Sequence, residues 1–284
     1  MSRDLVVAFD CATDATCVAV LQFSDGGSGF AVVGSARDES GARHGGGVLL
    51  PLVQTLLRDA GAAQDDIAAL VVGAGPGTFT GVRIAVSTGR ALALALGRPI
   101  FGVSTLDALA AQALASPAAA AWTGPATVDG VVMVPLVDAR RRQVFAAGYT
   151  PGPDGWVRGA VVAIAPEEAT SALGAVSPGA RVVLVGADAL LEKGGGQHRA
   201  LTSIQVLDAA HLVLGQELLS GGGQLVAALA RACTGVDALE SDGTRGVAVR
   251  AGEPGSPERV NPIYVRPPDA DIHITKMRDP WGGR

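Results

Sequence analysis

The stretch LVVAFDCATDATCVAVLQFSDGGSGFAVVGSAR, residues 5–37, carries the pattern that decides the fold. It holds three apolar runs, Leu5–Asp10, Thr16–Phe23 and Gly29–Arg37, each rich in Val, Ala, Leu or Phe. A short polar segment separates the first two runs, and the glycine-rich SDGGSG separates the last two. Short runs of this kind joined by tight turns predict three strands in an antiparallel meander.

The periodicity changes from strand to helix after the meander. Apolar residues recur at helical spacing up to Gly61, and a strand is then expected at Ile67–Gly73 and a helix from about Phe79 to Leu96. The segment RPIFGVS predicts another strand, and a helix capped by Ser104 or Thr105 follows it. The order β-β-β-α-β-α-β-α is typical of an actin-like, or ribonuclease-H-like, half-domain.

A similar order begins again near Gly130. Strands are expected up to Asp138, over Val144–Tyr149 and over Trp156–Ile164, followed by a helix opening at APEEA and a strand at RVVLVG. A last apolar helix is expected near Ala209–Leu219. The repetition predicts an α/β protein with a duplicated actin-like, two-domain fold.

The domain assignment follows from this repetition. Residues 1–115 form the first half and residues 130–219 the second, joined by an Ala- and Pro-rich segment. Residues 220–259 contain GGG, SDGTRG and AGEPGSPER, a composition typical of a low-complexity insertion that the core does not need. Residues 260–284 are expected to hold a short terminal strand at VNPIYVRPPDA and a frayed tail.

The charge balance disfavours a nucleic-acid binder that works alone. The 284-residue chain has a formal net charge of −5, and its 22 basic residues are scattered. Phosphate contacts need clustered Lys and Arg, and the densest basic run is Arg140–Arg142. If the protein acts on nucleic acid, we expect a partner to supply most of the basic surface.

The cysteines and the N-terminus favour a reducing, cytoplasmic location. Cys11, Cys17 and Cys233 form no CxxC pair and are odd in number, which is typical of free thiols rather than of a disulfide or metal site. The first residues lack a long apolar run and a small-residue cleavage site. No segment offers about 20 apolar residues free of Gly and charge, so no membrane span is expected.

The loop after the strand at Ile67–Gly73 resembles a phosphate-binding turn at first sight. Its sequence, GAGPGTFTG, lacks the Gly-Lys-Ser/Thr ending of a P-loop and the third glycine of a dinucleotide fingerprint. Two interpretations stay open. The amides at the start of the next helix could bind an anion weakly, or the glycines could serve only a sharp turn and close packing.

The turn after the first strand is where an actin-like ATPase would hold phosphate, in the pattern Asp-x-Gly-Thr/Ser. Here Asp10 is present, but Ala12 replaces the glycine, which leaves Thr13 and Thr16 as donors. Asp10 and Thr13 are therefore weak candidates for cofactor binding. A second DGT, at Asp242–Thr244, follows no apolar strand and is expected in a surface turn.

The sequence contains few of the residue patterns that metal-dependent or hydrolytic chemistry requires. The four histidines, His44, His198, His211 and His273, form no HxxxH or HExxH, so no metal site is expected. There is no Gly-x-Ser-x-Gly nucleophile elbow. Asp138 and Arg140 could form a salt bridge within a turn or line a cleft.

Several long motifs resemble the bacterial TsaB (YeaZ) family. Gly73–Ala110, GAGPGTFTGVRIAVSTGRALALALGRPIFGVSTLDALA, is similar to the family's Gly-Pro-Gly-Ser-Phe-Thr-Gly-x-Arg loop and the helix after it, with Thr78 in place of the usual Ser. Further similar segments are VVAFDCATDATCVAVL, RHGGGVLLPLVQTLL, VDARRRQVFAAGY and PIYVR. The family loop corresponds to these residues: Gly75, Pro76, Gly77, Thr78, Phe79, Thr80, Gly81 and Arg83. The VDARRRQ hairpin carries Asp138 and Arg140.

The resemblance implies an actin-like fold and a role in making threonylcarbamoyladenosine beside the anticodon of tRNAs. It implies a non-catalytic subunit that forms a heterodimer with TsaD, the catalytic paralogue, and works with the ATPase TsaE. It also implies a homodimer when the protein is alone, contact with tRNA only through the complex, and ATP or ADP only in that complex. The alternatives are a stand-alone actin-like ATPase or kinase and a metal-dependent peptidase.

If the protein acts through a partner, the two N-terminal helices are the expected contact surface. Both are apolar on more than one face, and their small residues would allow close approach of another helix. The candidate interface residues are Leu49, Leu50, Val53, Leu57, Ala85, Thr88, Gly89 and Leu92. Periodicity alone does not say which of them face outward.

Overall fold

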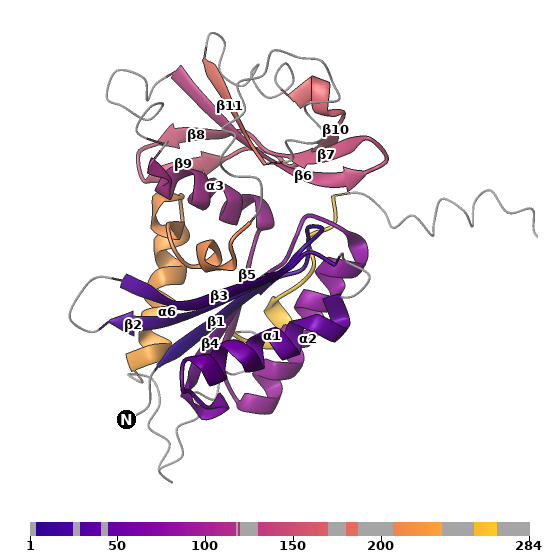
Figure 1. The fold of residues 1–284 in the computed structure, drawn as a ribbon. Coiled ribbons are helices and arrows are strands. Elements are labelled where there is room, and N and C mark those ends of the chain that lie inside the picture. Colours follow the sequence, from indigo (N-terminus) through magenta and orange to yellow (C-terminus); the bar gives the residue numbers. More distant parts are fainter. Residues whose placement is uncertain are drawn as a thin grey trace, which may run out of the picture.

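A computed structural model describes the fold over most of the chain. The described residues are 4–24, 29–40, 45–117, 119, 130–169, 180–186, 207–234 and 253–265. They form two mixed α/β halves, each built around one sheet, with α3 and residues 207–219 between them (Figure 1). The duplicated actin-like architecture predicted from the element order is confirmed.

The first sheet has five strands in the order β3-β2-β1-β4-β5. The first three pair antiparallel as the predicted meander, whereas β4 and β5 are added in parallel. Every residue of β1 and β4 is buried, as expected for central strands that are covered on both faces. The strands are β1 (Leu5–Asp10), β2 (Thr16–Ser24), β3 (Gly29–Asp38), β4 (Ile67–Gly73) and β5 (Ile100–Val103).

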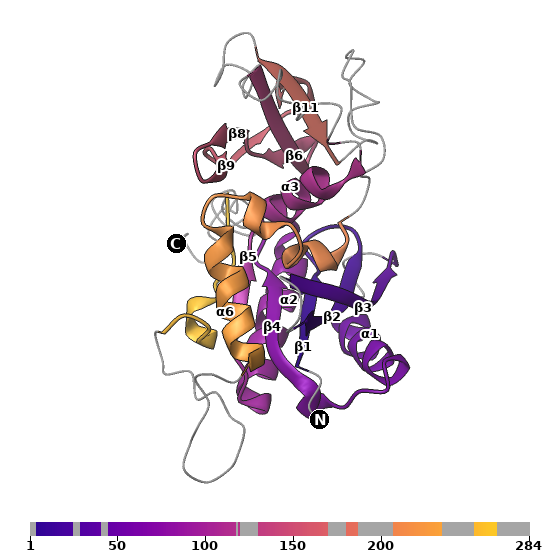
Figure 2. The same ribbon diagram turned by 90° about the vertical axis from the view of Figure 1, so that its left-hand side faces the viewer.

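Helices cover both faces of this sheet. The helices α1 (Gly45–Asp59) and α2 (Phe79–Leu96) share one core cluster with the side chains of Val7, Phe9 and Val72. On the opposite face, α3 (Thr105–Ala115) and α6 (Gly222–Thr234) share another cluster with Val6, Ala8 and Val71. Figure 2 shows α6 and α1 on opposite sides of the strands. The alternation of neighbouring residues between the two clusters is the two-residue period of a strand.

Among the described residues, α2 is the one helix long and apolar enough to cross a membrane by length and composition alone. Such a finding is weak evidence, because the core helix of a soluble protein passes the same test. Here α2 carries Gly81, Arg83, Gly89 and Arg90. Its buried residues pack on the first sheet.

The second sheet has the order β10-β7-β6-β8-β9, with β11 pairing in parallel with β6. Its strands are β6 (Val131–Arg140), β7 (Gln143–Ala146), β8 (Tyr149–Gly152), β9 (Gly155–Arg158), β10 (Val162–Ile164) and β11 (Arg181–Val185). The predictions of single strands over Val144–Tyr149 and Trp156–Ile164 were wrong, because each of these stretches divides in two. Both breaks involve a glycine, and the amide of Gly159 donates to the carbonyl of Gly148 at 2.8 Å.

The main core runs from one half to the other through α3. This helix is buried on most of its circumference, and its alanines allow it to fit between the first sheet and β6. Met133, Phe145 and Tyr149 of the second sheet belong to the same cluster as Ala8 and Val71 of the first. The two halves therefore share one core rather than meeting at a polar hinge.

The predicted helix near Ala209–Leu219 was wrong. Two 3₁₀ turns occupy the stretch, η5 (Ala209–Leu212) and η6 (Gln216–Leu218). The Asp208 carboxylate caps the first turn by accepting from the Ala210 amide at 3.0 Å. Gly215 then takes a left-handed conformation with φ of 74°, which ends the helical path.

The prediction that residues 220–259 are an insertion outside the core was also wrong where the structure describes them. The helix α6 contacts β4 and β1 of the first sheet, and its Leu229 and Cys233 are buried in the main core. Residues 235–252 of the predicted insertion lie outside the described residues. The boundary drawn at 219 therefore cuts through a segment that returns to the first half.

The predicted terminal strand at VNPIYVRPPDA is absent from the part of it that the structure describes, residues 260–265. Residues 253–265 contain one 3₁₀ turn, η7 (Pro257–Arg259), and an irregular segment after it. Pro262 lacks the amide hydrogen that a strand ladder needs. The Ile263 amide still donates to the carbonyl of Ala74 at 2.7 Å, so the segment lies along the end of β4. The tail after 265 lies outside the described residues.

Candidate functional site

The glycine-rich loop packs directly on the turn after β1. A Cβ atom on Gly77 would lie 2.2 Å from the carbonyl oxygen of Ala12, and one on Gly81 would lie 1.8 Å from that of Cys11. Real side chains do not approach backbone this closely, so both positions require glycine. The Thr78 amide, at the start of α2, donates to the Ala12 carbonyl at 2.7 Å.

This contact bears on the two interpretations of the loop that the sequence left open. An anion-binding helix start offers its free amides to the ligand. In this loop the Thr78 amide is bonded to the protein's own backbone, and Gly77 and Gly81 are spaced for that backbone. The geometry therefore supports close packing over phosphate binding.

The loop also holds the C-terminal segment. The Arg83 guanidinium lies 3.7 Å from the centroid of the Phe79 ring, and its Nε donates to the Tyr264 hydroxyl at 3.0 Å. The rings of Phe79 and Tyr264 have centroids 5.3 Å apart. Two residues of the family motif thus anchor a tyrosine that follows Arg83 by 181 positions. Sequence reasoning missed this cluster, because no local pattern connects residues so far apart.

Asp10, a weak cofactor candidate, is fully buried and used inside the protein. Its Oδ2 accepts from the Thr105 hydroxyl at 2.7 Å, and its Oδ1 accepts from the Ala12 amide at 2.6 Å. Burial raises the pKa of the Asp10 carboxyl above its ordinary value. These contacts tie the end of β1 to the first turn of α3.

Thr13, the other weak cofactor candidate, lies on the surface side of the same turn. Its hydroxyl donates to the Ala15 carbonyl at 3.2 Å and closes a local turn. The structure brings Asp10 and Thr13 into one turn, as expected. Both side chains form hydrogen bonds with neighbouring groups of the protein.

We expect Asp10→Asn to gain stability relative to the wild type as the pH rises. The raised pKa means that the folded state holds the Asp10 proton more tightly than the unfolded chain does. The stability that this bound proton adds to the folded state is fully present below the pKa of Asp10 in the unfolded chain, about 3.9. It is lost as the pH rises through the higher pKa of Asp10 in the folded state. Urea unfolding of both proteins from acidic to neutral pH measures the difference.

The Asp10→Ala variant is the control for this prediction. It leaves the Ala12 amide and the Thr105 hydroxyl without their acceptor, so it should lower the free energy of unfolding by about 1–3 kcal/mol. A stability difference between wild type and Asp10→Asn that does not change with pH would contradict the prediction.

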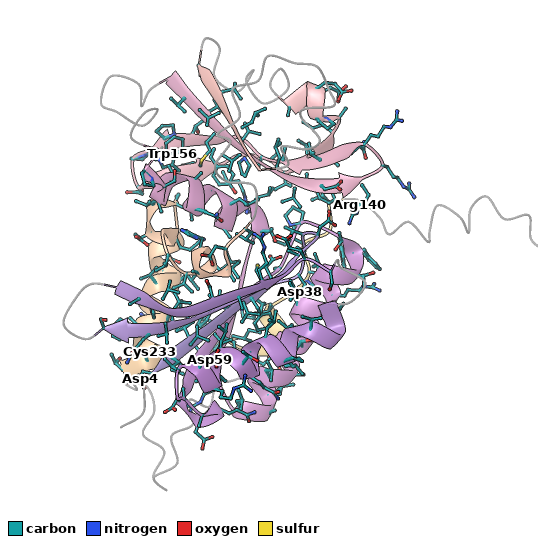
Figure 3. All side chains as sticks on the ribbon, viewed as in Figure 1. Asp4, Asp38, Asp59, Arg140, Trp156 and Cys233 are labelled. Atoms are coloured by element: carbon teal, nitrogen blue, oxygen red, sulfur yellow. The ribbon has the colours of Figure 1, made fainter. Side chains whose placement is uncertain are left out.

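Asp138 and Arg140 form the salt bridge within a turn that the sequence suggested, and a further ion pair extends it. Arg140 donates to Asp138 at 3.0 Å and also pairs with Asp14 in the turn after β1. The Asp138 carboxylate accepts from the Arg140 amide at 2.7 Å. Figure 3 shows Arg140 at the edge of the second sheet that faces the first half. The hairpin of the second half is thus connected to the first half.

The structure divides the eight interface candidates. Leu50 is 41% exposed, and Thr88 and Leu92 are partly buried. The other five were wrong as candidates for an exposed interface, because their positions are buried between the helices α1 and α2 and the first sheet. They are Leu49, Val53, Leu57, Ala85 and Gly89. Leu57, for example, is only 5% exposed.

No group of three His, Cys, Asp or Glu side chains that could hold a metal ion occurs within the described ranges. Of the four histidines only His211 lies there, and burial lowers the pKa of its imidazole. His44, His198 and His273 lie outside the described residues.

The chain matches known proteins on both sequence and structure. Residues 39–177 match the family model described as TsaD: tRNA N6-adenosine threonylcarbamoyltransferase. A Mycobacterium tuberculosis protein is 35% identical over 147 residues, which is 52% of this chain and 60% of that protein. The Escherichia coli tRNA threonylcarbamoyladenosine biosynthesis protein TsaB is 35% identical over 151 residues, 53% of this chain and 57% of that protein.

A solved structure, YeaZ from Pseudomonas aeruginosa, is similar over 93% of this chain and all of its own, with a TM-score of 0.58 and 26% identity. The chain is similar to members of the TsaB (YeaZ) family. In sequence, this chain matches about 60% or less of the length of the first curated relatives. The GPGTFTG motif of the loop described above lies within the residues that match the family model.

Proposed function

We propose that this protein is a non-catalytic subunit in the biosynthesis of threonylcarbamoyladenosine on tRNA. In this proposal it forms a heterodimer with a TsaD-like transferase, a TsaE-like ATPase joins the complex, and tRNA is bound through the complex. Any ATP or ADP is bound with the partners. When alone, the protein forms a homodimer.

The loop packing carries the proposal. The turn where an actin-like enzyme would hold phosphate is covered by Gly77, Thr78 and Gly81, and its Asp10 is bonded to Thr105. A relative named as a biosynthesis protein of the same modification agrees with a role in that pathway. The protein keeps the actin-like fold, but its own backbone packs against the turn that would hold phosphate. This arrangement agrees with the role of a non-catalytic subunit.

The exposed face of α1 and α2 supports the position of the partner contact. Leu50 of α1 and Leu94 of α2 are 41% and 69% exposed, and α1 and α2 contact each other. Large apolar side chains gathered on neighbouring elements are typical of an interaction surface.

We expect Leu50→Glu to weaken binding of the TsaD-like partner by roughly 30-fold or more, since a central contact residue is typically worth about 2 kcal/mol. Leu218→Glu is the matched control, because Leu218 is 40% exposed but lies on η6, away from α1 and α2. Size exclusion and titration with the organism's own partner measure pairing, and reconstituted tRNA modification measures function. Normal pairing by folded Leu50→Glu would place the interface elsewhere.

Ala85→Arg, a charged substitution at another of the interface candidates, would not test the interface. Ala85 is fully buried, so the arginine would disturb the core instead of a surface.

The two other function classes, a stand-alone ATPase or kinase and a metal-dependent peptidase, predict a different result for the isolated protein. Steady ATP hydrolysis would favour a stand-alone ATPase. Peptide cleavage would favour a peptidase, the class to which a similar Pseudomonas aeruginosa structure is compared in its description.

A further inference from the structure

The hairpin between β6 and β7 has a backbone that its residues do not favour. Arg140 pairs with Gln143, so Arg141 and Arg142 form a two-residue loop. The φ angles of Arg140, Arg141 and Arg142 are 63°, 56° and 59°. Two-residue hairpin loops with positive φ at both positions strongly prefer Asn-Gly or Asp-Gly, because other L-residues bring their Cβ close to the following carbonyl.

The apolar core does not account for the arginines. Arg141 and Arg142 are exposed at the tip of the hairpin, and no core cluster includes the loop. Arg140 has a structural role, since it is paired with Asp14 and Asp138. The loop therefore keeps two strained arginines at its tip, and strain of this kind is typically retained where a side chain has a function.

The charge of the chain makes this tip distinctive. The net charge is −5, and residues 140–142 are the densest basic run in the sequence. The ion pairs of Arg140 with Asp14 and Asp138 connect the base of the hairpin to both halves. A guanidinium presents several donors in a plane and binds phosphate bidentately.

We infer that Arg141 and Arg142 contact the phosphate backbone of the RNA substrate in the assembled complex. The inference rests on the proposed function, since it takes the RNA that the complex modifies as the ligand. Such contacts position the RNA independently of base sequence. They add to a basic surface that the partners supply, because two arginines on an acidic chain are too few to bind RNA alone.

The test replaces the tip by the pair that the turn prefers, Arg141→Asn with Arg142→Gly. We expect the melting temperature to stay the same or rise, because the turn strain is relieved. In the reconstituted complex, RNA binding should weaken by tenfold or more near 0.15 M salt, and the slope of log K against log[salt] should fall by about 1–2, as for two lost phosphate contacts. Filter binding of the RNA across a salt series measures both.

The charge-keeping variant Arg141→Lys with Arg142→Lys is the control and should retain most of the affinity and the salt slope. Arg231→Gln on α6, an exposed arginine away from the hairpin, should change neither. An Asn-Gly variant that pairs with its partners and binds RNA with unchanged affinity and slope would overturn the inference. So would a loss of pairing with the TsaD-like protein, which would make the tip a protein contact. A wild-type complex that neither binds nor modifies RNA would refute the proposed function itself.

Discussion

Leu229→Ala is expected to lower the free energy of unfolding by about 2–5 kcal/mol. Leu229 is fully buried in α6 and packs in the core that joins the first sheet to α3. Removing a buried leucine side chain costs the lost burial of its methyl groups and leaves a cavity. Urea or thermal unfolding of the purified variant measures the effect.

The same reasoning predicts that deletion of residues 220–259 removes part of the core. The control is Ala227→Ser, because Ala227 lies exposed on the same helix and should change stability by no more than about 0.5 kcal/mol. If the deletion, or Leu229→Ala, melted at the wild-type temperature, α6 would be an appendage, as its sequence suggests.

Gly81→Ala should destabilise the fold by about 3 kcal/mol or more. The new methyl group would lie 1.8 Å from the Cys11 carbonyl, so either α2 or the turn after β1 must move. Overpacking typically costs about 1–3 kcal/mol, and a clash with backbone lies at the upper end because backbone yields less than a side chain. Gly77→Ala should behave similarly, since its methyl group would meet Ala12.

Gly47→Ala is the matched control for the loop glycines. Gly47 lies exposed in α1, with open space where a Cβ would be, so alanine should be neutral or stabilise the helix by up to about 1 kcal/mol. A Gly81→Ala protein that is as stable as the wild type but fails to bind a nucleotide would return the loop to the anion-binding interpretation. Parallel unfolding and nucleotide titration of the three variants distinguish the outcomes.

Local sequence determined most of the first half. The three runs in residues 5–37 have a strand period and tight turns, and they form the meander as predicted. The expected bounds of the helix at Phe79–Leu96 agree with α2, because Gly97, with φ of 60°, is a strong stop signal. The family motif was equally visible, since it is a contiguous run of residues.

The tertiary structure decided what the apolar stretches pack against. Periodicity shows that α1 has more than one apolar face, but the sheet buries Leu57 and leaves Leu50 exposed. The helix α6 follows a glycine cluster and looks dispensable in the sequence, yet it fills the face of the first sheet opposite α2. Burial is set by neighbours far away in the chain, which a window of residues does not contain.

Some features of the candidate site were likewise determined by the sequence, and others only by the tertiary structure. The sequence by itself determined that GPGTFTG is neither a P-loop nor a dinucleotide fingerprint, because those motifs are defined by spacing. Only the tertiary structure decided that Gly77 and Gly81 face the backbone of Ala12 and Cys11, and that Phe79 and Arg83 meet Tyr264. These contacts join residues tens to hundreds of positions apart, and hydrogen bonds and close approach at such separations depend on the folded path of the whole chain.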